Sequence, residues 1–247
     1  MTTQAVKLTE MVAVPDRGRI FTEPPVRPGL ADCAPTGRVR LDALARFVQD
    51  IAYADAEDAR LSRRAAWVVR RTRMRVERFP RFGERLELAT FCSALGRMWA
   101  ERRTTIAAGE VDVVSLWVHL DPRSGRPTPL TEEEIAMWGE STAGRKVTAR
   151  LHHPNPEGTE ESVPWRFRAT ECDLADHINN AAYLQPLEEE LIGGGGGELE
   201  SIDVEIEYRS PAQPGEMLVL REGARRWIVS GEGEAHASLI IASLNRE

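Results

Sequence analysis

The 247-residue sequence lacks the features that mark disulfide-rich, membrane-spanning and secreted proteins. Its three cysteines, Cys33, Cys92 and Cys172, are widely separated and form no C-x-x-C pair, which argues against a disulfide framework and a thiolate metal site. Its longest apolar runs, such as residues 65–69, are far shorter than the about 20 residues that cross a bilayer. We therefore expect no membrane span, and the cysteine pattern indicates a reducing cytoplasm. The N-terminal residues show no basic flank before an apolar run, so we expect no secretory signal.

The chain also lacks a net positive charge. It has 32 Lys and Arg against 39 Asp and Glu, a formal charge of -7. A charge of this sign repels a phosphate backbone, so we expect no nucleic-acid binding. The charge is unevenly spread, because residues 61–104 contain twelve arginines and four acids, a local balance of +8. Apolar residues make up 42% of the chain, which is ordinary for a folded globular protein.

What the sequence does contain is an internal repeat at half its length. Residues 80–88 read PRFGERLEL and residues 211–220 read PAQPGEMLVL, which correspond if one residue is inserted. Each stretch follows a run with strand-like alternation, residues 67–79 in the first half and 201–209 in the second. The pattern predicts a turn between paired strands in each half.

Each half is predicted to contain a leading strand, one long helix and three or more antiparallel strands. We therefore expect an α+β fold in which each helix is wrapped by a curled sheet. The corresponding segments are 26–32 and 167–173 before the helices, the helices 41–59 and about 178–192, and the closing strands 110–121 and 234–245. The predicted boundaries are 15–142 for the first domain, 143–162 for a linker and 163–247 for the second domain.

Three local features qualify this scheme. Pro186 falls inside the second predicted helix and is expected to kink it unless the first turn accommodates it. The linker contains His152 and His153, but no third residue at metal-ligand spacing, so we expect no metal site. Five consecutive glycines, residues 193–197, are expected to end the second helix.

The segment CDLADHINNAAY, residues 172–183, has the densest set of functional side chains and lies just before the second helix. Asp and Asn often cap the first amides of a helix, so one interpretation is capping beside a structural histidine. The other interpretation is catalytic. Amides at the helix start would hold a developing oxyanion, while Asp173 or His177 activates water.

The chain resembles the bacterial acyl-acyl carrier protein thioesterases, relatives of the plant plastid enzymes. Residues 67–111 resemble the family's Trp-Val-Val strand and its V-E-R-x-P-x-x-G-E turn, and residues 173–183 resemble its D-x-x-x-H-x-N-N-x-x-Y motif. The resemblance implies two tandem hotdog domains and hydrolysis of the thioester between a fatty acyl chain and the phosphopantetheine arm of acyl carrier protein, within fatty acid biosynthesis. We expect hydrolysis with water and without a cofactor or metal, by a monomer or a homodimer.

Carried over by position, the resemblance assigns catalytic roles to Asp173 and His177, and it places Asn179 and Asn180 on the family's Asn-Asn pair. The oxyanion would be held by amides at the start of the second helix. Asp32, taken as the partial counterpart of Asp173 in the first half, has no following histidine and is expected to be structural.

Two positions depart from the family's catalytic set. Ala175 stands where the plant enzymes have a catalytic Asn, and Ser210 follows the Glu-Tyr-Arg strand where they have Glu or Cys. Glu189 on the second helix and Glu207 on the strand are candidate replacement acids, although both positions are more simply read as solvated. The alternatives are therefore a degenerate acyl-binding or carrier-docking protein, or an acyl-coenzyme A thioesterase. A hotdog hydratase is disfavoured because its motif has another Asp–His spacing.

The arginine-rich strand also has two interpretations. Alternation puts Val68, Met74 and Val76 on one face and three arginines on the other, Arg71, Arg73 and Arg75. The arginines are either an ordinary solvated sheet face or a docking surface for an acidic carrier protein, where local positive charge would raise the encounter rate.

Overall fold

A single antiparallel sheet organises the computed structural model, which describes residues 8–61, 66–158, 160–195 and 197–246. The strand order is β1-β3-β4-β5-β2-β7-β10-β9-β8-β6. The first-half strands are β1 Phe21–Thr22, β2 Ala66–Val76, β3 Leu88–Leu95, β4 Trp99–Ile106 and β5 Val111–Leu120. The second-half strands are β6 Glu161–Phe167, β7 Leu199–Tyr208, β8 Gly215–Glu222, β9 Arg225–Ser230 and β10 Ala235–Arg246.

The two halves of the sequence meet where β2 pairs with β7. Outward from this junction, the strands follow the same order on both sides. The last strand of each half comes first (β5 or β10), then two further strands, and the leading strand (β1 or β6) lies at the edge. The expected combination of a large antiparallel sheet and a few helices is confirmed.

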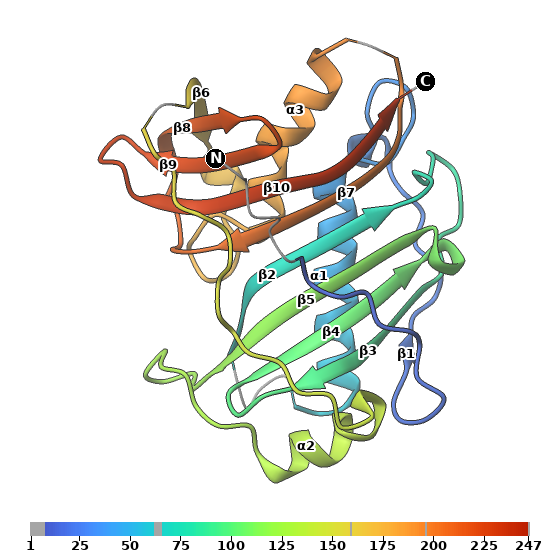
Figure 1. Cartoon of the computed structure of the whole chain (residues 1–247). Helices are drawn as coiled ribbons and strands as arrows, with labels where there is room; N and C mark the ends of the chain where they lie inside the picture. Colours follow the sequence, from blue (N-terminus) through green and yellow to red (C-terminus); the bar gives the residue numbers. More distant parts are fainter. Residues whose placement is uncertain (1–7, 62–65, 159, 196, 247) are drawn as a thin grey trace.

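Helix α1, Leu41–Asp58, ends one residue before its predicted end. Its buried side chains Leu44, Val48 and Ile51 follow the spacing of an amphipathic helix and are at most 4% exposed. Figure 1 shows α1 crossing behind the sheet, so that this face packs against the strands. The resulting apolar core includes residues from both halves of the chain.

The second predicted helix consists of two pieces. A 3-10 helix, η5, covers Asn180–Leu184, and the α-helix α3 covers Gln185–Gly193. Pro186 lies at the start of α3, where its missing N–H has no intrahelical partner to lose, so the predicted kink is replaced by a fresh helix start. A further helix, α2 Glu132–Trp138, was not expected and begins with a Thr131–Glu134 capping box.

One predicted strand face was wrong at its beginning. The pairing of β2 with β5 shifts register between Val69 and Arg71, which marks a β-bulge. The bulge reverses the alternation before it, so Val68 is 47% exposed and Val69 is 3% exposed. Met74 and Val76 lie beyond the bulge and are buried as predicted.

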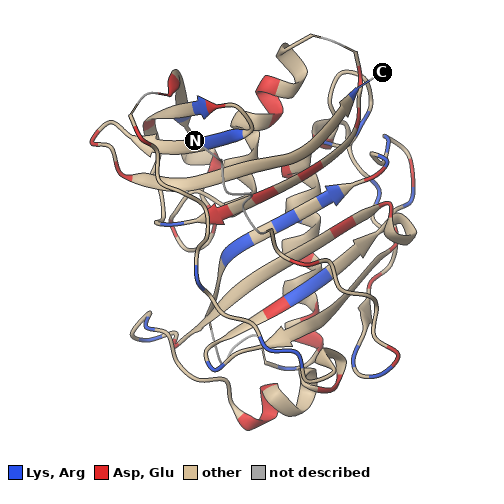
Figure 2. Cartoon of the chain, viewed as in Figure 1, with Lys and Arg blue, Asp and Glu red and all other residues tan. Residues whose placement is uncertain are grey.

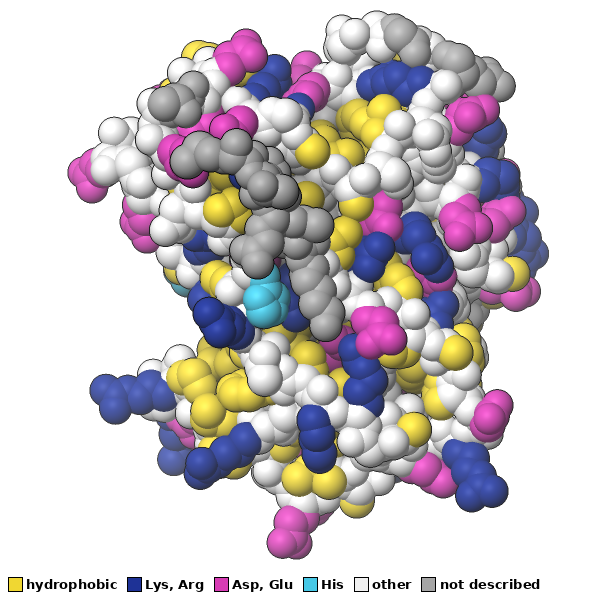
Figure 3. Space-filling model, viewed as in Figure 1, with side chains coloured by type: hydrophobic (Ala, Val, Ile, Leu, Met, Phe, Trp, Pro, Cys, Tyr) yellow, Lys and Arg dark blue, Asp and Glu magenta, His cyan; other side chains and the backbone are white. Residues whose placement is uncertain are grey.

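The three arginines of β2 lie opposite three acids of β7, with the register Arg71↔Glu207, Arg73↔Glu205 and Arg75↔Asp203. Figure 2 shows the positive and negative bands side by side, and Figure 3 shows charges of both signs interspersed on this side of the molecule. We call this set of six residues the charged junction. Its strongest contact is a bidentate pair in which Arg73 donates to both Asp203 oxygens at 2.8 and 2.6 Å.

The charged junction changes how the arginines are interpreted. Arg71 is only 5% exposed and donates to the Arg150 carbonyl at 2.9 Å, and Arg73 also donates to the Thr9 carbonyl. These contacts engage Arg71 and Arg73 within the chain, and the carrier-docking role of Arg71, Arg73 and Arg75 stays a prediction. Within the described part of the chain, no helix is long and apolar enough to cross a membrane.

Candidate functional site

A cavity of about 640 Å³ lies beside α1 on the first-half side of the molecule. Its wall is formed by α1, by strands β2 to β5 and by α2, and one edge is formed by residues 173–175 and Asn179 of the second half. The apolar wall includes Ala56, Trp67, Cys92, Ala100, Trp117 and Trp138. The polar side chains at the cavity include Gln49, Asp50, Arg102, Asp173 and Asn179.

The polar edge of the cavity is a connected group of three side chains. Asn179 Nδ2 donates to Asp173 Oδ2 at 3.3 Å and to Gln49 Oε1 at 3.1 Å. Gln49 Nε2 donates back to Asn179 Oδ1 at 3.3 Å. The site therefore combines a carboxylate and two carboxamides, drawn from both halves of the chain.

A tight loop presents Asp173 to the cavity. The Asp173 N–H donates to the His177 carbonyl at 3.0 Å, and the Asp176 N–H donates to the Asp173 carbonyl at 3.1 Å. Asp176 closes the turn with φ 58°, in the left-handed region that Asp tolerates better than most residues. The Asp173 side chain is exposed and accepts a hydrogen bond from the Ala175 N–H at 2.9 Å, so its carboxylate is held and still accessible.

His177 lies in the same loop, but its side chain is not among the described residues that line the cavity. The residue is half-buried. Its backbone carbonyl is used to close the loop around Asp173. The structure therefore brings Asp173 and Asn179 together at the cavity and leaves the imidazole outside its wall.

Asn179 also occupies the amides that were expected to hold an oxyanion. It is the N-cap of η5, and its Oδ1 accepts from the Ala181 N–H at 2.9 Å. Its backbone carbonyl accepts from the Ala182 N–H at 2.9 Å. These two amides are satisfied by the cap, so the capping interpretation of this segment is correct for them.

The remaining predicted residues lie away from the main cavity. Asn180 borders a separate small pocket of about 10 Å³ deeper in the core, and its carbonyl accepts from the Tyr208 hydroxyl at 3.1 Å. Glu189 is exposed on α3, as its solvated interpretation predicted. Its neighbour Glu188 is instead 2% exposed and pairs with Arg38 at 2.5 Å.

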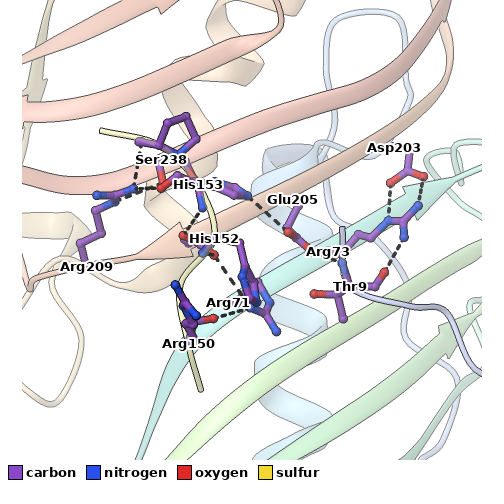
Figure 4. Close-up of polar contacts among 12 residues, drawn as sticks. Thr9, Arg71, Arg73, Arg150, His152, His153, Asp203, Glu205, Arg209 and Ser238 are labelled. Carbon is purple, nitrogen blue, oxygen red and sulfur yellow. Dashed lines mark hydrogen bonds and ion pairs between the residues drawn. The ribbon is translucent and has the colours of Figure 1, made fainter. Parts of the chain in front are cut away.

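The interpretation of Glu207 as a solvated residue was wrong, because it is 0% exposed. The segment that joins the two halves passes over it, and its carboxylate accepts from the N–H groups of His152 at 2.6 Å and His153 at 3.0 Å. Figure 4 shows this segment lying over β7, with the His153 ring between Ser238 and Glu205. Burial opposes the charged form of Glu205, but hydrogen bonds from His153 and Thr9 prevail and lower the pKa of that carboxyl. These contacts attach the linker to the sheet and lie outside the cavity.

The correspondence between Asp32 and Asp173 was also wrong by two residues. Asp32 caps a short 3-10 helix by accepting from the Gly29 N–H at 2.8 Å, and Glu171 caps the matching helix of the second half by accepting from the Arg168 N–H at 2.5 Å. The first-half position that matches Asp173 is therefore Ala34. Asp32 is structural, as predicted, and it also pairs with Arg46 at 2.7 Å.

At the inner wall of the cavity, the charge of Arg102 is balanced by the Asp55 carboxylate. Arg102 contacts Asp55 at 2.6 Å, and the Trp138 indole donates to the same carboxylate at 3.2 Å.

Burial raises the pKa of the Cys92 thiol to about 12, so this cavity residue is a neutral thiol and a poor nucleophile near neutral pH. Partial loss of hydration raises the pKa of the Asp50 carboxyl, with Arg46 opposing the shift.

Sequence reasoning missed Gln49 and the three tryptophans of the cavity. Gln49 lies on α1, 130 residues before its partner Asn179, and only the way the halves pack reveals the contact. The alternation around Trp67 and Trp117 marked them as strand residues, but no signal in the sequence pointed to a shared cavity.

Two sequence comparisons relate this chain to known proteins. Residues 27–138 match the family model of the acyl-ACP thioesterase N-terminal domain, which confirms the predicted resemblance. Uncharacterized protein Rv2001 of Mycobacterium tuberculosis strain H37Rv is 28% identical over 221 residues, which cover 85% of each chain.

Solved structures show the same hotdog fold. An oleoyl thioesterase structure from Lactobacillus plantarum has a TM-score of 0.71 at 20% identity and covers 93% of this chain and 97% of its own. The 12:0-ACP thioesterase from Umbellularia californica has a TM-score of 0.70 at 19% identity, with 94% and 99% covered. At these identities the likeness establishes the fold.

Proposed function

We propose that this chain, whose residues 27–138 match the family model of the acyl-ACP thioesterase N-terminal domain, hydrolyses the thioester of an acyl chain attached to acyl carrier protein. The products are a free fatty acid and the carrier thiol. The observation that supports this most directly is the accessible Asp173 carboxylate at the edge of a largely apolar cavity. An apolar cavity suits an acyl chain, and a carboxylate at its edge suits activation of water.

In the proposed mechanism, Asp173 accepts a proton from a water molecule as the water oxygen attacks the thioester carbonyl carbon. The C–S bond then breaks, and the leaving thiolate takes up the proton that Asp173 accepted. Atoms and charge balance with water as the only co-substrate. Asn179 does not react in this scheme, because its carboxamide is engaged in holding Asp173.

In this mechanism the residues of the 172–183 motif have other roles than the resemblance implied. Asp173 alone is the general base, and Asn179 is a positioning residue. His177 maintains the loop through its backbone carbonyl. With Ala175 and Ser210 in place of the plant side chains, activity depends on this one carboxylate and on how well the cavity positions the thioester.

We further infer that the chain consists of two tandem hotdog domains, residues 15–142 and 163–247, joined by the linker 143–162. The mirrored strand order on the two sides of the β2–β7 junction supports this division. All three cysteines are free, in keeping with the cytoplasm as the place of action.

Hydrolysis by the purified protein tests the proposed function. Release of fatty acid is measured with a series of acyl chain lengths, each attached either to acyl carrier protein or to coenzyme A. We expect turnover, with higher kcat/KM on the carrier-linked substrates. Turnover on coenzyme A alone would support the acyl-coenzyme A alternative, and binding of either substrate without turnover would support a degenerate acyl-binding protein.

A further inference from the structure

The contact between Gln49 and Asn179 joins the two halves at the edge of the cavity. Gln49 comes from α1 of the first half and is half-buried, with its amide turned toward the second-half loop. Its helix neighbours Val48 and Ile51 are 4% and 0% exposed, so the backbone that carries Gln49 is fixed by the core. The Gln49 amide is therefore presented to Asn179 from a rigid element.

Chemistry fixes the orientation of both amides in this contact. The Ala181 N–H can only donate, so it must meet Asn179 Oδ1, and the Asp173 carboxylate can only accept while ionised, so it must meet Asn179 Nδ2. Gln49 then has one complementary orientation, with Oε1 accepting from Nδ2 and Nε2 donating to Oδ1. Both donors and both acceptor positions of Asn179 are thereby used.

We propose that Gln49 is a positioning residue for hydrolysis, which holds Asn179 and, through it, the Asp173 carboxylate. The inference deepens the proposed function and rests on it. A carboxamide whose four hydrogen bonds are all made cannot turn without breaking them, so the Asp173 oxygen that accepts from it is also fixed. The catalytic carboxylate belongs to the second half, but its orientation is set by the first.

A substitution of nearly equal length tests the hydrogen bonds of Gln49. Gln49→Met keeps the bulk of the side chain and removes both hydrogen bonds to Asn179. We expect kcat to fall by about tenfold to a hundredfold, because a slightly misplaced catalytic group loses its near-attack geometry. KM should change by less than about twofold, since Gln49 is not proposed to bind the substrate. A kcat within about twofold of the wild-type value would overturn the proposal.

Gln49→Glu tests whether position 49 acts on the Asp173 carboxylate or only fills space on α1. The new carboxylate can still accept from Asn179 Nδ2, and an oxygen there would lie within 6.4 Å of Asp173 Oδ2, the sum of the two distances to that shared nitrogen. A second negative charge this close should move the acid limb of the kcat profile to higher pH by about one unit. The matched control is Ala54→Glu, which adds the same charge to α1 at a position outside the cavity wall. A shift of equal size in both variants would contradict the proposal.

A measurement that needs no turnover distinguishes this inference from the proposed function. The side-chain NH2 of Asn179 should give a pair of well-resolved NMR signals that exchange slowly with solvent in the wild-type protein. In Gln49→Met these signals should exchange faster and move toward the positions of exposed asparagines. Unchanged signals would refute the positioning role even if the wild-type enzyme were active. If hydrolysis is absent but the signals change as expected, only the proposed function fails.

Discussion

The loops that precede the two helices share one backbone arrangement and differ in the side chains they present. In the first, the Ala34 N–H donates to the Arg38 carbonyl at 2.8 Å, and in the second, the Asp173 N–H donates to the His177 carbonyl at 3.0 Å. Each then turns at a residue with positive φ and continues into its helix. The position that carries a carboxylate in the second loop carries only a methyl group in the first.

The contacts from the opposite helix differ in the same way. In the first loop, Glu188 of α3 accepts from Arg38 at 2.5 Å and from the Leu41 N–H at 3.1 Å, and both charged side chains are buried. In the second loop, Gln49 of α1 contacts Asn179 through neutral amides and leaves Asp173 open to the cavity. The first loop is closed by a buried ion pair, whereas the second leaves a carboxylate open to the cavity, where we propose that it reacts.

The largest effect on stability is therefore expected at the closed loop. Glu188→Gln removes the counter-charge of the buried Arg38 and should lower the free energy of unfolding by about 3 kcal/mol, because breaking a buried pair leaves one charge uncompensated. Gln49→Met should change it by less than about 1 kcal/mol. Denaturant unfolding of both variants measures the difference, and equal losses would contradict the contrast between the loops.

Narrowing the cavity should sharpen the contrast through the substrate. Ala100 lines the cavity wall and is 9% exposed, so Ala100→Phe should occupy space needed by an acyl chain. We expect kcat/KM for long chains to fall by about tenfold or more, while short chains are affected less. Kinetics over a series of chain lengths will show this, and a uniform decrease would indicate that Ala100 does not contact the chain.

The imidazole of the second loop should contribute less than the carboxylate. His177→Ala is expected to lower kcat by less than about tenfold, because the ring lies outside the described cavity wall. Steady-state kinetics at saturating substrate provides the test. A loss of a hundredfold or more, about the loss expected of a general base, would return His177 to the catalytic set.

The smallest effect concerns pH and the end of α3. A hydrogen bond from Arg226 lowers the pKa of Glu190 below its ordinary 4.5, although burial acts in the opposite direction. The stability from this pair is full above that ordinary value and is lost as pH falls through the lower folded value. Glu190→Gln should therefore show a shallower acid-induced loss of stability than the wild type, with a difference at neutral pH of about 1 kcal/mol or less. Parallel pH dependences would show that the pair contributes nothing.

The sequence predicts only part of the difference between the two loops. Asp173 and Asn179 could be found because they lie six positions apart in one dense motif. The face of Met74 followed from alternation, whereas that of Val68 did not, because a bulge depends on the partner strand. The burial of Glu207 could not be predicted, since it depends on where the linker crosses the sheet. Gln49 could not be predicted either, because its contact with Asn179 forms only where the first helix meets the second loop.

Single-turnover hydrolysis by Asp173→Asn tests the account most directly. The variant keeps the shape of the side chain but cannot accept a proton from water, so we expect the rate of thioester cleavage to fall by at least about a hundredfold. Asp176→Asn is the matched control, because Asp176 lies in the same exposed loop and Asn tolerates its positive φ. It should retain nearly full activity. Cleavage by Asp173→Asn within about threefold of the wild-type rate would show that this carboxylate is not the base.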